Sequence, residues 1–161
     1  MDKGERVCVM ATVLVCGALL AVAQKPKNSI ARDPYIGAIA VDADSGRTLF
    51  EERADVPGYP ASTLKLMVLL LIQERIDAGK LKLDDMVGVS VTASKTGGSQ
   101  VYLDPRESFS VEDMLYATII QSANDAAVAL AEHVAGSKEA FIKMMNDRAR
   151  ELGMADTRFA S

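Results

Sequence analysis

The sequence predicts an α+β fold in which a pair of strands comes first and a group of helices follows. The first observation is a pair of short apolar stretches that flank a turn within residues 35–51. The second is the helical pattern after Pro60, where glycines stop several segments that begin with capping residues. A length of 161 residues is sufficient for one domain with a real core.

Residues 1–23 predict a signal peptide that precedes the domain. An apolar run extends from Val7 to Ala23 and ends in small residues, as at a cleavage site, and it is short for a membrane span. Acidic residues dilute the positive charge at the start, so an uncleaved membrane anchor stays an alternative. Both cysteines, Cys8 and Cys16, lie in this segment. The mature chain would therefore have neither a disulfide scaffold nor a cysteine nucleophile, and we expect it to be exported.

The next segments predict a linker and a β-hairpin. Residues 24–34 are polar and contain two prolines, which is typical of a linker. Residues 35–41 and 47–51 predict two strands, and Asp44-Ser45-Gly46 between them has turn chemistry. Residues 52–59 then form a loop that leads to the first helix.

The helix that begins near Pro60 is apolar on all sides, which predicts burial inside the domain, and it should end near Ala78-Gly79. Ser62 and Lys65 are three residues apart and share a face. Burial disfavours a charged lysine, and a neutral amine can take the proton from a serine hydroxyl to create a nucleophile. Alternatively, Ser62 is only a helix cap and Lys65 extends to solvent.

From Leu81 onward the sequence predicts short helices joined by loops. Ser110 and Asp113 resemble a capping box at the start of one helix. The other predicted helix boundaries are caps at Asn124-Asp125 and Ser137 and stops at Gly136 and Gly153.

Ser122-Ala123-Asn124 lies between two of these helices, about 60 residues after Ser62. A second serine near Lys65 can relay a proton to a leaving group. The Asn124 amide can orient Lys65 and donate to a peptide carbonyl of a substrate. Alternatively, Ser122 and Asn124 are caps in a turn between helices. The two motifs together are more specific than either motif alone.

Ser62-x-x-Lys65 and Ser122-x-Asn124 resemble, in this order, two of three signatures of penicillin-binding proteins and serine β-lactamases. The flanking residues make the chain similar, from about residue 36 to its end, to the D-alanyl-D-alanine carboxypeptidases, which are low-molecular-mass penicillin-binding proteins. The stretches that carry this similarity are residues 59–67, 97–100, 121–127 and 130–137.

The resemblance implies a β-lactamase/transpeptidase-like fold and a serine peptidase in the periplasm or on the bacterial cell surface. Such an enzyme removes the terminal D-alanine of peptidoglycan stem peptides through an acyl-enzyme, without a cofactor, and β-lactam antibiotics inhibit it covalently. By motif, Ser62 is the nucleophile, Lys65 the base, Ser122 the proton relay and Asn124 a substrate contact.

The third signature of the family, Lys-Thr/Ser-Gly on a sheet strand, does not follow Ser122 before the sequence ends at Ser161. We therefore expect residues 35–161 to be the N-terminal part of a catalytic domain whose later strands are missing. Because these strands would be missing, we expect the 161-residue chain to be inactive on its own. Lys95-Thr96-Gly97 has the same letters, but it precedes Ser122 and has no strand pattern, so we do not assign it the role of the third signature.

The composition of the chain argues against several classes of binding partner. A net charge of −4, a pI near 5 and the lack of tryptophan argue against nucleic-acid binding. With one histidine and no cysteine in the mature chain, we expect no metal site. Membrane contact is expected only through the signal segment or through a C-terminal anchor beyond the sequence.

Three alternatives stay open. One is a class A-like serine β-lactamase, although Ala123 stands where that class usually has aspartate. Another is a non-catalytic remnant that binds peptidoglycan or β-lactams, and the last is an exported helical interaction module.

Overall fold

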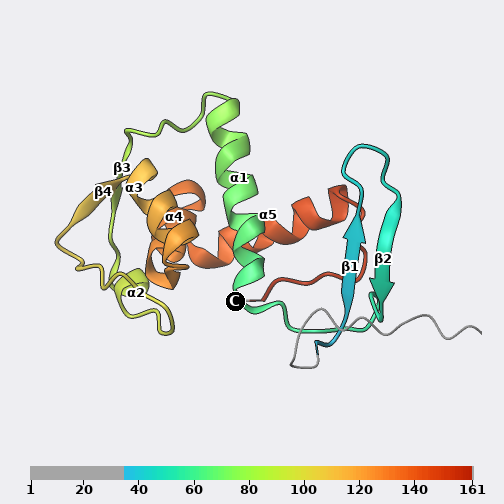
Figure 1. Cartoon of the computed structure of the whole chain (residues 1–161). Coiled ribbons are helices and arrows are strands. Elements are labelled where there is room, and N and C mark those ends of the chain that lie inside the picture. Colours follow the sequence, from blue (N-terminus) through green and yellow to red (C-terminus); the bar gives the residue numbers. More distant parts are fainter. Residues whose placement is uncertain (1–34, 161) are drawn as a thin grey trace, which may run out of the picture. The chain divides into compact units, whose positions relative to one another are not determined.

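The computed structural model describes residues 35–160, which form two compact units, one ending at Val56 and the other beginning at Pro57. The predicted signal peptide, residues 1–23, and the predicted linker, residues 24–34, lie outside the described residues. Within the described part of the chain, each helix is too short or too polar to cross a membrane. Figure 1 shows the elements of both units.

The first unit contains the predicted hairpin. Strand β1 (Ala38–Val41) pairs antiparallel with β2 (Thr48–Glu52), and the register shifts between Ala40 and Val41. The turn is stabilised by the Asp42 carboxylate, which accepts the backbone N–H of Ser45 at 2.9 Å. The hairpin prediction is therefore confirmed.

The second unit is built around helix α4, which packs against α1, α2, α3 and α5 (Figure 1). Two three-residue strands, β3 and β4, form a small antiparallel sheet in this unit. Its elements are η1 (Ala61–Leu64), α1 (Lys65–Asp77), β3 (Met86–Gly88), α2 (Val91–Ser94), β4 (Ser108–Ser110), α3 (Val111–Ile120), α4 (Asn124–Ala135) and α5 (Lys138–Glu151).

The core of the second unit forms where the helices meet. Its largest fully buried apolar side chains are Phe141, Ile72, Met114, Leu130 and Val87. Helix α4 contributes mainly alanines to this core, and such small side chains let neighbouring helices approach closely. The Arg148 guanidinium donates to the Glu74 carboxylate at 2.7 Å and joins α5 to α1.

Most predicted helix boundaries are confirmed. Ser110 accepts the backbone N–H of Asp113 at 3.0 Å, and Ser137 accepts that of Ala140 at 3.1 Å, so both serines are N-caps. Helix α1 ends at Asp77, next to the predicted stop. Helix α4 differs from the prediction because it begins at Asn124, with Ala123 in the N-cap position.

Two other expectations need correction. Strands β3 and β4 interrupt a region that was predicted to be only helices and loops. Each has three residues, which is too short for an alternating pattern to be read from sequence. The first helix is also not buried on all sides, because Leu66 is 68% exposed whereas Ile72 is fully buried.

The core position of Ile72 gives a first prediction. An Ile72→Ala substitution should lower the free energy of unfolding by about 2–5 kcal/mol, because it removes buried methyl groups and leaves a cavity. Ile119→Ala is the matched control, since Ile119 is 57% exposed, and it should change stability little. Urea unfolding of both variants measures the difference, and equal losses would contradict the assignment of Ile72 to the core.

Candidate active site

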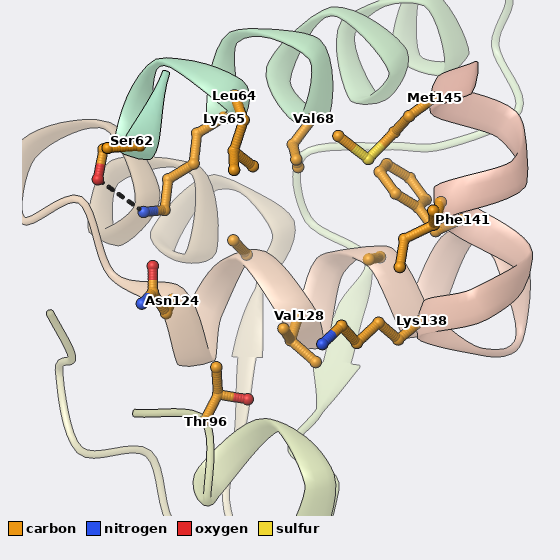
Figure 2. A pocket seen from close by; sticks show the side chains of 14 residues that line it. Ser62, Leu64, Lys65, Val68, Thr96, Asn124, Val128, Lys138, Phe141 and Met145 are labelled. Atoms are coloured by element: carbon orange, nitrogen blue, oxygen red, sulfur yellow. Dashed lines mark hydrogen bonds between the residues drawn. The ribbon is translucent and has the colours of Figure 1, made fainter. Parts of the chain in front are cut away.

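Ser62 and Lys65 lie at the start of the first helix, as predicted, but Ser62 is in the 3-10 turn η1 and Lys65 is the first residue of α1. The Lys65 Nζ atom lies 3.3 Å from Ser62 Oγ, as Figure 2 shows. The serine is exposed, whereas only 7% of Lys65 is exposed. The turn conformation brings the amine to the hydroxyl, so the predicted contact is confirmed.

The alternative interpretation of these two residues is wrong. Within residues 35–160, neither η1 nor α1 has an N-cap side-chain hydrogen bond, so Ser62 does not act as a cap. Lys65 is buried and does not extend into solvent.

Ser122 completes a group of three polar side chains. Its Oγ atom lies 3.2 Å from Lys65 Nζ, so the amine is within hydrogen-bond distance of two serine hydroxyls. Ser122 occupies the loop between α3 and α4 with a φ of +56°, in the left-handed region that residues other than glycine seldom adopt. Ala61, next to Ser62, has a φ of +46°. Strained backbone of this kind concentrates at functional sites.

Burial lowers the pKa of the Lys65 ammonium below its ordinary value, because the low-polarity surroundings disfavour the charged form. A cavity lies next to Lys65, and none of the residues that line it is acidic. The Lys65 ammonium therefore has no carboxylate partner in that cavity. A lower pKa increases the fraction of neutral amine at a given pH. The neutral amine can accept a proton from a hydroxyl at either serine.

Asn124 lies beside this group, but its contacts differ from the expectation. Its Nδ2 atom donates to the Gly97 carbonyl at 2.7 Å, and within the described residues it makes no hydrogen bond to Lys65. Helix α4 has Ala123 at its N-cap and, in the described structure, no side-chain cap bond. Ser122 and Asn124 are therefore not caps of α4, and the capping alternative is wrong.

A cavity of about 400 Å³ adjoins these residues (Figure 2). Ser62, Lys65 and Asn124 line its polar end, and Phe141 and Met145 line its apolar end. The other lining residues are Ala61, Leu64, Val68, Thr96, Ala127, Val128, Ala131, Lys138 and Ile142. A volume of this size is within the range of small-molecule sites.

Lys95-Thr96-Gly97 follows helix α2 and is not in a strand. Thr96 nevertheless lines the cavity, and the Gly97 carbonyl accepts the Asn124 amide. Sequence reasoning did not find either contact, since both bring together residues far apart in the chain. It predicted Asp125 only as part of a helix cap, whereas the structure places this residue inside α4, fully buried beside Asn124.

Comparison with known proteins identifies the family. The family model described as D-alanyl-D-alanine carboxypeptidase matches residues 23–161. The chain belongs to this family. Its relatives include the D-alanyl-D-alanine carboxypeptidase DacF of Bacillus subtilis, which is 43% identical over 76% of this chain and 31% of the relative. DacC of Escherichia coli is 44% identical over 75% of this chain and 32% of the relative.

Solved structures confirm the α+β fold of the β-lactamase/transpeptidase type. The crystal structure of the D-alanyl-D-alanine carboxypeptidase DacD from Francisella tularensis has a TM-score of 0.78 at 34% identity, over 86% of this chain and 33% of that one. Penicillin-Binding Protein D2 from Listeria monocytogenes, in its ampicillin-bound form, has a TM-score of 0.68 at 31% identity, over 78% of this chain and 50% of that one. The chain spans about a third of the length of the curated relatives it matches.

The lowered pKa of Lys65 gives a second prediction, which concerns stability. Between that lowered pKa and the ordinary lysine pKa of about 10.4, the unfolded chain binds more protons than the folded one, so stability rises with pH. Below this window the buried charge costs stability in full. A Lys65→Met substitution should therefore raise the free energy of unfolding at pH 7, and the gain should shrink as the pH approaches 10.4.

Urea unfolding at several pH values measures this gain. The control is Lys80→Met, because Lys80 is exposed and its removal should have no comparable effect. A Lys65→Met protein that is less stable than the wild type at pH 7 would contradict the assigned cost of burying the ammonium.

Proposed function

We propose that this chain forms the nucleophile-bearing part of a serine-type D-Ala-D-Ala carboxypeptidase that acts on peptidoglycan stem peptides. One observation carries the proposal: the buried Lys65 amine lies between two serine hydroxyls, at 3.3 Å from Ser62 and 3.2 Å from Ser122. The names of the relatives support the substrate class. Since the chain spans about a third of these relatives, the activity is proposed for the complete gene product, meaning this chain joined to a strand with Lys-Thr/Ser-Gly.

In the first step, Ser62 Oγ attacks the carbonyl carbon of the penultimate D-alanine, and neutral Lys65 takes the hydroxyl proton. The exposed position of Ser62 lets a peptide reach it, while the burial of Lys65 lowers its pKa and so favours the neutral form of the amine. The product is a tetrahedral intermediate whose oxygen carries the negative charge. Its stabilisation needs hydrogen-bond donors near Ser62.

In the second step, the carbon–nitrogen bond breaks and the proton passes from Lys65 through Ser122 to the nitrogen of the departing D-alanine. This assignment is supported by the single amine that bridges both hydroxyls. The remaining ester on Ser62 is the acyl-enzyme. Water then attacks that ester, and the proton that it gives up restores the Ser62 hydroxyl.

Asn124 is proposed as the substrate contact, with its side-chain amide donating to a peptide carbonyl. It lines the same cavity as Ser62 and Lys65, which supports this role. The Nδ2 atom is already bonded to the Gly97 carbonyl, so a substrate must take its second amide hydrogen.

Two further features of the proposal concern inhibition and location. We propose β-lactams as covalent inhibitors at Ser62, which the ampicillin-bound Listeria relative supports. Location in the periplasm or on the bacterial cell surface is proposed from the signal-like residues 1–23.

Release of D-alanine from a diacyl-D-Ala-D-Ala peptide tests the proposal on the complete gene product. We expect one D-alanine for each peptide cleaved, and a Ser62→Ala control with no release. A relative named D-alanyl-D-alanine endopeptidase, 34% identical over 86% of this chain, makes a second activity worth testing. Cleavage of a cross-linked dimer without release of D-alanine would favour the endopeptidase.

Two other results would reject the carboxypeptidase. Rapid turnover of penicillin without D-alanine release would favour a β-lactamase. Binding of penicillin with neither acylation nor peptide cleavage would favour a non-catalytic binding protein.

A further inference from the structure

We propose that Asp125 is a positioning residue for Ser122 and Asn124. Its buried carboxylate holds residues 97–103, here called the strap, against the start of helix α4. The inference rests on the proposed function, because its main consequence is the rate at which Ser62 is acylated.

The contacts of Asp125 point to this role. Its side chain is fully buried. The carboxylate accepts the backbone N–H groups of Val101 at 3.2 Å, Leu103 at 3.1 Å and Ala126 at 3.0 Å. Within residues 35–160 it has no lysine or arginine partner, so backbone N–H groups supply the hydrogen bonds of its buried oxygens. Two of its three donors belong to the strap.

The strap backbone is shaped to reach this carboxylate. Tyr102, between the two donors, has a φ of +59°. A left-handed residue at such a place directs the neighbouring N–H groups to one side and forms an anion-binding nest. The Tyr102 side chain is 83% exposed, so the role of this residue lies in its backbone.

The strap also contacts the loop between α3 and α4 that carries Ser122. The Asn124 N–H donates to the Ser99 carbonyl at 2.7 Å, and Ser99 Oγ donates to the Gln121 carbonyl at 2.7 Å. The Asn124 amide donates to the Gly97 carbonyl at 2.7 Å. The strap therefore binds the residues on both sides of the Ser122-Ala123 pair.

Gly98 makes the approach of the strap to Asn124 possible. Its φ is +91°, and a Cβ atom added there would lie 2.6 Å from Asn124 Nδ2. A side chain at this position would displace the Asn124 amide. The fit of the strap against the turn is therefore tight as well as hydrogen-bonded.

These contacts matter because the backbone of Ser122 is strained. A left-handed conformation costs roughly 1–2 kcal/mol for an L-residue and persists only where the surroundings enforce it. The strap supplies that enforcement through Gln121 and Asn124. If the hydrogen bonds from the strap to Asp125 are lost, the turn relaxes and Ser122 Oγ moves away from Lys65 Nζ. A displacement of about 1 Å in such a group can cost about 10²-fold in rate.

The test uses Asp125→Asn in the complete gene product, with Asp104→Asn as the control. Asp104 follows the strap and pairs with Arg106 on the surface. Two quantities are measured: amide hydrogen exchange at Val101 and Leu103, and the rate constant for acylation of Ser62 by penicillin, per titratable site. We expect faster exchange at both amides and acylation about 10–100-fold slower in Asp125→Asn, and neither change in the control.

A second pair of variants keeps the test decisive if Asp125→Asn does not fold. Tyr102→Gly accepts the left-handed backbone without strain, whereas Tyr102→Val does not, because its side chain is β-branched. We expect the glycine variant to be acylated like the wild type and the valine variant to show fast strap exchange and slow acylation.

Three results discriminate between the possibilities. Faster exchange with unchanged acylation would overturn the proposal, because Asp125 would then only stabilise the fold. Unchanged exchange in both Asp125→Asn and Tyr102→Val would show that the carboxylate does not hold the strap. If the wild type is not acylated at Ser62, the proposed function fails, and the exchange data alone decide whether Asp125 holds the strap.

Discussion

A Lys65→Arg enzyme is expected to react with penicillin about 10²–10⁴-fold more slowly than the wild type, which is the usual contribution of a general base. Arginine keeps its proton in proteins, so it cannot accept the hydroxyl proton of Ser62. The wild-type lysine can do so because burial lowers its pKa. The rate of adduct formation on the complete gene product, followed by intact mass, measures the loss.

Lys95→Arg is the matched control for this experiment. Lys95 is exposed and begins Lys95-Thr96-Gly97, the segment that has the letters of the third signature but lies outside any strand. We expect its acylation rate to equal that of the wild type. A normal rate in Lys65→Arg would exclude lysine as the base, and an equal loss in Lys95→Arg would show that this segment takes part in the chemistry.

Replacement of Ser122 by alanine is expected to slow turnover of a D-Ala-D-Ala peptide by about 10²-fold or more, because the proton relay to the departing amine is lost. The hydroxyl lies 3.2 Å from Lys65 Nζ and has no other side-chain partner in the described structure. Release of D-alanine under saturating peptide measures the effect.

A Ser122→Gly variant separates the effect of losing the hydroxyl from the effect of the strained backbone. Glycine accepts the left-handed backbone at this position, so the glycine variant should be more stable than the alanine variant by about 1 kcal/mol. Both variants lack the hydroxyl and should be equally slow. A glycine variant with wild-type turnover would show that the backbone of Ser122 matters and its hydroxyl does not.

The sequence predicts the parts of the site that depend on local spacing. Ser62 and Lys65 are three residues apart, so one turn of helix brings them together without help from the rest of the chain. The caps at Ser110 and Ser137 are also local, because each serine bonds an N–H three residues ahead. The contact between Lys65 and Ser122 was a prediction from two motifs, and the structure places the two atoms 3.2 Å apart.

The parts that escaped sequence reasoning depend on distant segments. The strap reaches Asp125 across about 24 residues, and such a pairing leaves no periodic pattern in the sequence. Asn124 was expected to contact Lys65, but its amide donates to Gly97 instead. The exposure of Leu66 likewise depends on what packs against α1, which the apolar letters of the helix do not reveal.

The most direct test of the central claim is the position of the penicillin adduct on the complete gene product. Treatment with penicillin, followed by intact-mass measurement and peptide mapping, locates the modified residue. The account predicts one adduct per molecule, on Ser62. An adduct on Ser122, or none in a protein that carries all three signatures, would contradict the assignment of Ser62 as the nucleophile.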